Sequence, residues 1–381
     1  MNFRSYEIKD ICKIKSGKRL PKGTDFSEKP TRHKYIRARD IKNGKIDGSD
    51  LGYISEETQK KIERYIVNTN DIIITIAGTI GEVALVSKKF DGVNLTENAV
   101  RLTEFSKDVC PEFLAYILKS PERKEYMEQV AGGSAQPKLG IYKIEAIKVD
   151  LPDVQIQHKI ADILSAYDNL IENNQKQIKL LEEAAQRLYK EWFVDLRFPG
   201  HENTKIVDGV PEGWRRGLLQ ELIDVNYGKD HKKAPDDGNI PVYGSGGLMR
   251  KCNKSLFSGE AVLIPRKGSL NNIMYVDETF WTVDTMFYAT MKQPHTAVFV
   301  YFFVKAFDMY SMNIGAAVPS MTTKILDAMD VVIPDKETLE KFDKRAKVYF
   351  NKIKTLQGQN EQLRISRDLL LPKLMSGEVE V

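Results

Sequence analysis

The segment that comes nearest to a catalytic motif is Ser16-Gly17-Lys18. A phosphate-binding P-loop has the pattern GxxxxGK[ST], in which backbone N–H groups and a lysine hold the phosphates. The first glycine of that pattern is missing, because position 12 is cysteine. The chain also lacks the GxSxG serine elbow, the HExxH zinc motif and an Asn/Asp-Pro-Pro-aromatic sequence of the kind amino-methyltransferases use. The sequence therefore favours a binding protein over an enzyme.

Residues that ligate metals or form disulfides are also dispersed. The five histidines, at positions 33, 158, 201, 231 and 295, have no metal-ligand spacing. Cys12, Cys110 and Cys252 are isolated, so neither a CxxC motif nor a disulfide framework is implied. We expect no metal and no cofactor, and a reducing cytoplasm suits the cysteines best.

Basic side chains are the chemical groups that cluster. The net charge is only +4, but residues 1–45 carry 14 Lys/Arg against five acids, and residues 229–270 carry eight against four. A local basic excess attracts polyanions. A solvated basic face without a partner is the alternative for either cluster alone.

Length and hydropathy limit the class of protein. A chain of 381 residues with 42% apolar residues is long enough for two or three cored domains. Its longest apolar run, Ala297 to Val304, is eight residues, well below the ~20 that span a bilayer. The N-terminus carries charge where a signal peptide has an apolar stretch. We expect a protein that is neither exported by that route nor embedded in a membrane.

The chain repeats itself, which decides the expected architecture. At a shift of 182 residues, Ile144, Leu151 and Pro152 align with Leu326, Ile333 and Pro334. At a shift of 211, Phe3-Arg4 and Gly17-Lys18 align with Trp214-Arg215 and Gly228-Lys229. Each copy ends in a long helical stretch, 153–191 or 335–371. The sequence therefore predicts globule, helix, globule, helix, as two diverged copies of one unit.

The globules are expected to be mixed, with more strand than helix. Short apolar runs that end at glycine predict buried strands, and a glycine-rich segment predicts a loop. These expectations cover strands at 71–78 and 261–268, a loop at 243–247, and helices that begin at 113–118 and 297–303.

Both helical stretches carry apolar residues in alternating steps of four and three, the 3.5-residue period of a coiled-coil seam. Each helix would be ~55 Å long, too long for its own globule to bury. If the two pack together, chain order makes them antiparallel. A pseudo-twofold axis then pairs residues whose numbers sum to 534: Asn174 with Asn360, Leu181 with Ile353, and Ile171 with Leu363. An Asn pair in an apolar seam disfavours slipped registers.

Four aromatic residues lie at the end of the first helix, namely Tyr189, Trp192, Phe193 and Phe198. They either anchor a partner protein or seat the helix against the second globule. The second interpretation is slightly favoured.

In order, duplication and spacing, these features resemble the specificity (S) subunit of type I restriction-modification enzymes. The resemblance covers essentially the whole chain. The segments that carry it are Trp214-Arg-Arg, Tyr35-Ile36-Arg37 with Asp40-Ile41, Ile240 to Gly247, the strand–glycine segments 71–81 and 260–271, and Pro152 and Pro334 before the helices. The first copy departs from the second in having Phe3 where the second has Trp214.

The resemblance implies an α+β fold, in which two similar mixed α/β target-recognition globules are separated by two long antiparallel coiled-coil helices. The expected boundaries are 1–152 for the first recognition domain, 153–198 for the first spacer helix, 199–334 for the second domain, and 335–381 for the second helix and tail. Each domain would read one half of a split site in double-stranded DNA, without catalysis. The helices would set the spacer and dock two methylation subunits, and restriction subunits would join through the complex. A stand-alone methyltransferase or nuclease with degenerate motifs, or a structural scaffold, are the alternatives.

The candidate DNA contacts follow from side-chain chemistry. Lysines and one arginine are assigned to phosphates, other arginines to guanine edges, a glutamine to adenine, and tyrosines to sugars or bases. The candidate DNA-binding residues are Lys18, Arg19, Lys22, Lys229, Lys232, Lys233 and Lys267, then Arg37, Arg39, Arg250 and Arg266, then Gln136, and finally Tyr35 and Tyr243. The alternatives are surface ion pairs for the arginines and core packing for the tyrosines.

Overall fold

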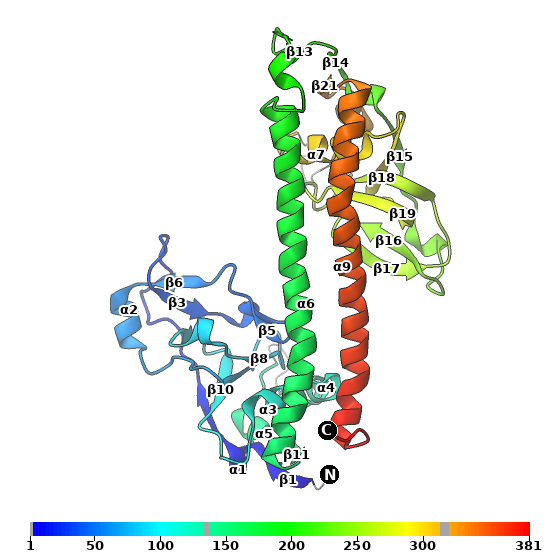
Figure 1. Ribbon diagram of the computed structural model, residues 1–381. Coiled ribbons are helices and arrows are strands. Elements are labelled where there is room, and N and C mark those ends of the chain that lie inside the picture. Colours follow the sequence, from blue (N-terminus) through cyan, green and yellow to red (C-terminus); the bar gives the residue numbers. More distant parts are fainter. Residues whose placement is uncertain (1–2, 133–136, 313–319) are drawn as a thin grey trace. The chain divides into compact units, whose positions relative to one another are not determined.

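A computed structural model describes residues 3–132, 137–312 and 320–381, without the side chain of Lys233. The chain divides into two compact units. Unit 1 comprises residues 1–171 and 361–381, and unit 2 comprises residues 172–360. Each unit combines one globule with a section of two long helices, α6 (Val154–Tyr189) and α9 (Lys336–Ser376) (Figure 1). The fold is α+β, as the sequence predicts.

The globule of unit 1 is built from short strands. Its main sheet has the order β2-β10-β7-β8, and a second sheet has the order β6-β3-β9, in which β3 and β9 are parallel. The strands are β1 (Arg4–Glu7), β2 (Lys13–Ser16), β3 (His33–Ile36), β4 (Ile41–Lys42), β5 (Lys45–Ile46), β6 (Gly52–Ile54), β7 (Ile72–Thr75), β8 (Val83–Leu85), β9 (Asn94–Leu95), β10 (Ala99–Thr103) and β11 (Lys148–Leu151). The helices are α1 (Ile8–Ile11), α2 (Glu56–Lys61), α3 (Pro111–Leu118), α4 (Pro121–Val130) and α5 (Ile141–Glu145).

The globule of unit 2 contains a six-stranded sheet of order β15-β20-β18-β19-β16-β17, which leaves β17 at one edge. The apolar helix α7 packs on β18 and β19. The strands are β12 (Ile206–Val207), β13 (Val210–Pro211), β14 (Arg215–Leu218), β15 (Ile223–Tyr227), β16 (Ile240–Gly244), β17 (Gly247–Cys252), β18 (Phe257–Pro265), β19 (Met274–Thr282), β20 (Met286–Met291) and β21 (Asp330–Ile333). The helices are α7 (Ala297–Lys305) and α8 (Thr323–Asp327).

The sequence repeat is a structural repeat. In unit 1, β1 pairs antiparallel with β11, so that Arg4 lies opposite Leu151. In unit 2, β14 pairs antiparallel with β21, and Arg215 lies opposite Ile333. Each ladder ties the start of a globule to the strand that precedes its long helix. The two-copy architecture predicted from the sequence is therefore confirmed.

Most of the expected local elements are present. The strands predicted at 71–78 and 261–268 correspond to β7 and β18, and the two predicted helices are α3 and α7. The loop predicted at 243–247 is too long, because only Ser245 and Gly246 form a turn. Tyr243 and Gly244 end β16 and Gly247 begins β17, so the segment is a hairpin. Gly247 has a φ of +112°, which a glycine adopts without steric cost.

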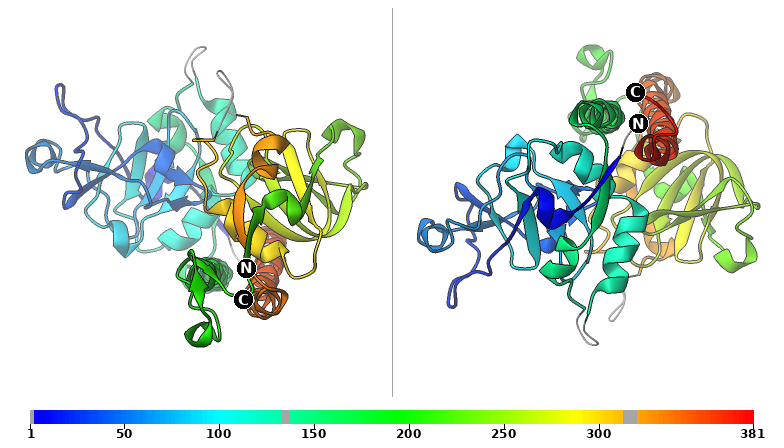
Figure 2. Two further views of the ribbon diagram at one scale, coloured as in Figure 1. Left: turned by 90° about the horizontal axis from the view of Figure 1, so that it is seen from above. Right: turned by 90° about the horizontal axis from the view of Figure 1, so that it is seen from below.

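In each unit, α6 and α9 lie side by side and antiparallel, and Figure 2 shows both nearly end on. In unit 2 the amide of Asn174 donates a hydrogen bond of 3.0 Å to the Asn360 carbonyl oxygen. Both side chains are buried, as is Ile353, while Leu181 is half-buried. In unit 1, Ile171 is buried and Leu363 half-buried, and Arg367 of α9 forms an ion pair with Asp168 of α6. The seam residues therefore face the interior of the helix pair in both units.

The aromatic residues at the end of α6 seat it against the globule of unit 2. Tyr189 and Trp192 are 8% and 2% exposed. Phe193 makes edge-to-face contacts with Phe299 of α7 and Phe342 of α9. Burial leaves these rings unavailable to a partner protein, so the packing interpretation holds.

Candidate nucleic-acid interface

The first basic corner lies at the end of β2 in unit 1. Gly17 N–H donates to Ala99 O at 3.1 Å, and Lys18 N–H donates to Leu95 O at 2.8 Å. A Cβ on Gly17 would lie 1.9 Å from Thr96 O, so only glycine fits this close approach. The backbone therefore fixes the position of Lys18, whose side chain is exposed.

A second corner repeats this arrangement at the end of β15 in unit 2. Gly228 N–H donates to Met286 O at 3.0 Å, and Lys229 N–H donates to Thr282 O at 2.9 Å. A Cβ on Gly228 would lie 2.0 Å from Val283 O. Lys229 is exposed in the same way as Lys18. The duplicated Gly-Lys pair thus has the same backbone environment in both units.

Other exposed cations surround the two corners. The Arg19 side chain is 81% exposed and lies 2.8 Å from the carboxylate of Glu97. Lys22 is exposed, and Lys232 is exposed in a short 3-10 turn that the Asp230 side chain caps. The side chain of Lys233 and the whole of Gln136 lie outside the described part of the chain, so these two predicted contacts stay predictions.

All four arginines proposed to read guanine donate hydrogen bonds within the protein, and two of them, Arg37 and Arg250, are held by several such bonds. Arg37, with 18% of its side chain exposed, donates from Nε and Nη2 to the Asp40 carboxylate at 2.9 Å. Arg250, with 22% exposed, donates to His231 O at 2.5 Å and to Ala234 O at 2.7 Å. These bonds hold the surrounding loops, and base contact would require breaking them. Arg37 therefore fits the ion-pair alternative, and Arg250 stabilises the loop at His231 and Ala234.

The two tyrosines belong to the interior, which corrects their assignment to sugars or bases. Tyr35 is 3% exposed and its hydroxyl donates to Lys18 O at 2.6 Å. Burial raises the pKa of Tyr35 to about 12. Tyr243 is half-buried and donates to Glu278 at 2.5 Å. Burial, and then the bond to Glu278, raise the pKa of its phenol above the usual value. Both tyrosines therefore pack within the protein, and neither ring has a face free to contact a sugar or a base.

The remaining two arginines, Arg39 and Arg266, are held by fewer hydrogen bonds within the protein. Arg39 has 67% of its side chain exposed and approaches the Asp50 carboxylate at 3.3 Å. The half-buried Arg266 lies over the ring of Tyr227, with 5.5 Å from its guanidinium carbon to the ring centroid. These two arginines stay the candidates for base contacts.

Unit 2 also has an aromatic component that sequence reasoning missed. Tyr227 and Tyr310 are 53% and 44% exposed. The Tyr310 hydroxyl donates to Gly268 O at 3.1 Å, directly after the exposed Lys267. Cations next to exposed rings are typical of surfaces that bind nucleic acid. The position of Tyr227 beside the Gly228-Lys229 motif was the signal available in the sequence.

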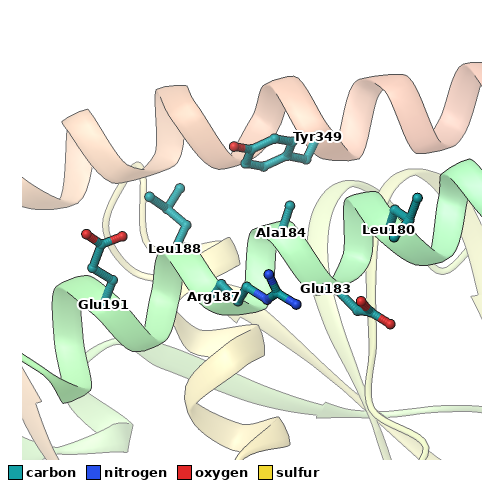
Figure 3. Close-up of a pocket in the computed structure, with 7 residues that line it drawn as sticks. All are labelled: Leu180, Glu183, Ala184, Arg187, Leu188, Glu191 and Tyr349. Carbon is teal, nitrogen blue, oxygen red and sulfur yellow. The ribbon is translucent and has the colours of Figure 1, made fainter.

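The helix pair of unit 2 has a surface groove of its own, shown in Figure 3. Its volume is about 270 Å³. Leu180, Ala184 and Leu188 of α6 face Tyr349 of α9, and charged residues of α6 lie around them. Leu180 is 63% exposed. An apolar groove between two helices fits a protein partner better than a polyanion.

Within residues 3–132, 137–312 and 320–381, no group of three or more His, Cys, Asp or Glu side chains is arranged to hold a metal ion. In the same residues, no helix is both long and apolar enough to cross a membrane.

Comparisons with known proteins agree with the duplicated fold. The family model described as "Type I restriction modification DNA specificity domain" matches residues 2–183 and 211–364. The chain belongs to this family, and contains its domain twice.

Individual relatives are similar over most of their length. The type I restriction enzyme MjaIX specificity subunit of Methanocaldococcus jannaschii is 26% identical over 370 residues, covering 86% of this chain and 82% of the relative. The HindI specificity subunit of Haemophilus influenzae is 22% identical over 479 residues, covering 99% and 100%. The crystal structure of a type I S subunit from M. genitalium matches with a TM-score of 0.66 at 19% identity, covering 98% of this chain and 96% of that chain, and so shares the fold.

Proposed function

We propose that this chain is the specificity subunit of a type I restriction-modification complex, and that it reads a bipartite site in double-stranded DNA. The observation that carries the proposal is the duplicated Gly-Lys corner, held by equivalent backbone hydrogen bonds in both units. Two similar basic surfaces suit the two halves of a split site. The family match across both copies supports this function over a scaffold without DNA affinity.

The division of labour follows the expected domain boundaries. Residues 1–152 and 199–334 each read one half-site, and the helices at 153–198 and 335–381 set the spacer. Exposed lysines at the corners, Lys18 and Lys229 among them, neutralise phosphates and supply salt-dependent affinity. Arg39 and Arg266 are the candidates for base edges.

The chain contributes recognition, and its partners contribute catalysis. We propose that methylation subunits dock on the helix pair, with the groove beside Leu180 and Tyr349 as one contact. Restriction subunits join through the complex. A cytoplasmic location follows from this role, because the DNA and the partner subunits are there. The relatives' designation as specificity subunits supports a non-catalytic chain.

Methylome sequencing tests the function directly. Deleting the gene is expected to remove one bipartite N6-methyladenine motif, and restoring it is expected to bring that motif back. An unchanged methylome in a strain whose methylation subunits are expressed would overturn the proposal.

Salt titration of the reconstituted complex tests the phosphate contacts. Lys232→Ala is expected to weaken binding to all sequences and to reduce the slope of log K against log salt by about 1. Lys176→Ala, an exposed lysine on α6, is the matched control and should leave the slope unchanged. Loss of discrimination at one base with an unchanged slope would contradict the role of Lys232.

A further inference from the structure

The two units carry different side chains at one position where their backbones are equivalent. Ile76 N–H donates to Asn98 O in unit 1, and Arg266 N–H donates to Thr285 O in unit 2, both at 2.8 Å. In both residues the backbone carbonyl accepts a further hydrogen bond of 2.9 Å from a later segment of the globule. Arg266 therefore occupies the position of Ile76, and unit 2 has a half-buried guanidinium where unit 1 has a buried apolar side chain.

The residue before the duplicated glycine differs in the same way. Tyr227 precedes Gly228 in unit 2, whereas the exposed Ser16 precedes Gly17 in unit 1. Tyr227 lies opposite Phe287 in the ladder of β15 and β20. The ring of Tyr227 meets the buried Phe287 ring edge to face, with 5.0 Å between the ring centroids. This contact with the core fixes the orientation of an exposed ring that unit 1 does not have.

Tyr227 and Arg266 contact each other. The guanidinium carbon of Arg266 lies 5.5 Å from the Tyr227 ring centroid, which is a cation–π contact. Nη1 of Arg266 donates to Asp284 O at 3.5 Å, and its Nε and Nη2 have no hydrogen-bond partner among the described residues. Nε and Nη2 form one fork of the guanidinium, and such a fork matches the O6 and N7 acceptors of guanine.

The surroundings of this pair are positively charged. The exposed Lys229 follows Gly228, and the exposed Lys267 follows Arg266. Unit 1 has a lysine only at the first of these two positions, since Ala77 follows Ile76. Cations on both sides of a guanidinium match a duplex, in which phosphates border the base edges. This charge pattern favours DNA as the ligand of the pair.

We propose, on the basis of the function proposed above, that Tyr227 is a positioning residue that holds the Arg266 guanidinium against a guanine in the half-site of unit 2. The ring limits the orientations of the guanidinium before DNA binds, which lowers the entropic cost of a bidentate contact. Unit 1 has serine and isoleucine at the equivalent positions, so it reads its half-site without this device. The two half-sites therefore differ at the base that this pair contacts.

The test measures binding of the reconstituted complex to its target DNA, in which each guanine of both half-sites is replaced in turn by 7-deazaguanine, which lacks the N7 acceptor. We expect the wild-type complex to lose affinity by about tenfold at a guanine of one half-site. Arg266→Lys keeps the charge but not the fork. It should bind the unmodified target about tenfold more weakly with an unchanged salt slope, and should no longer respond to 7-deazaguanine at that position.

Tyr227 is tested by a pair of substitutions. Tyr227→Phe keeps the ring beside the guanidinium and should behave as the wild type does. Tyr227→Ser introduces the residue type of unit 1, and should reduce both the affinity and the response at the same guanine.

The matched control is Tyr142→Ser, since Tyr142 of unit 1 is 68% exposed and its ring also lies beside a cation, Lys143. It should leave the response at that guanine unchanged, and circular dichroism checks that each variant is folded. The proposal is overturned if the wild type discriminates its target but responds at no guanine, if Arg266→Lys responds as the wild type does, or if Tyr227→Phe and Tyr227→Ser have equal effects. A wild-type complex that binds its target and unrelated DNA equally would instead refute the proposed function itself.

Discussion

The buried Asn174–Asn360 pair allows a quantitative test of the helix register. Asn360 is 3% exposed and Asn174 is 8% exposed, and they share a hydrogen bond of 3.0 Å. Asn174→Ala leaves the Asn360 amide buried without that partner, which costs about 1–3 kcal/mol of unfolding free energy. Asn360→Ala leaves the Asn174 amide buried without its partner, at a similar cost in unfolding free energy. The double variant leaves no buried amide without a partner. Its loss of unfolding free energy should therefore be smaller than the sum of the two single losses by about 1–2 kcal/mol.

The assay is urea unfolding followed by tryptophan fluorescence. All three tryptophans, Trp192, Trp214 and Trp281, lie within unit 2, so their signal reports the unit that contains the Asn pair. Gln175→Ala, at the exposed neighbouring position of α6, is the control and should change stability by less than about 0.5 kcal/mol. Additive losses in the double variant would show that the two amides are not coupled, and would refute the proposed register.

Three further predictions concern other contacts. Arg367→Ala removes the charge partner of Asp168, and should loosen the helix pair of unit 1 by about 1–2 kcal/mol, since the two side chains are 27% and 22% exposed. Hydrogen exchange over 154–171 measures this, and Arg364→Ala, 45% exposed, should have little effect. Lys13 and Lys15 lower the pKa of Glu104 to about 2, so its stabilising effect is complete above pH 4.5 and is lost as the pH falls towards 2. Glu104→Gln should therefore speed exchange in β2 at pH 6 and not at pH 2, and equal differences at both values would contradict the linkage. Gly358→Ala should stabilise unit 2 by about 0.5–1 kcal/mol, because the new Cβ meets open space in α9. Gly228→Ala should destabilise unit 2 by at least ~2 kcal/mol, because the new Cβ meets a carbonyl. Thermal unfolding followed by tryptophan fluorescence measures both changes, and the same sign for both would be inconsistent with this packing.

The architecture was largely predictable because it rests on patterns that repeat along the chain. The 3.5-residue period fixed the two helices, and the repeat supplied the pairing of Asn174 with Asn360 that the structure contains. Helix ends were less predictable: α9 continues through Pro372 to Ser376, beyond the expected 371. Packing against the core of unit 1, through residues such as Leu374, outweighs the local cost of a proline.

The candidate site was predictable only in part. Composition located the basic segments, because local charge is a sum over the sequence. It did not show which cations are already bonded within the protein. The carbonyls of His231 and Ala234 that hold Arg250 are distant in the sequence, whereas Asp40, which holds Arg37, lies three residues further along the chain. Nor did composition show that Tyr35 is interior while Tyr227 and Tyr310 are exposed.

By itself, the sequence determined the duplication, the antiparallel helices and the basic character of both copies, because periodicity and charge are properties of residue order. Only the tertiary structure decided which side chains remain available to DNA. Availability depends on burial and on competing hydrogen bonds between segments far apart in the chain. The hairpin of β16 and β17 illustrates this. Its glycine-rich tip predicted only a loop, whereas the structure shows that Ser245 at the tip contacts Asn272 and Gly268 of the turn after β18.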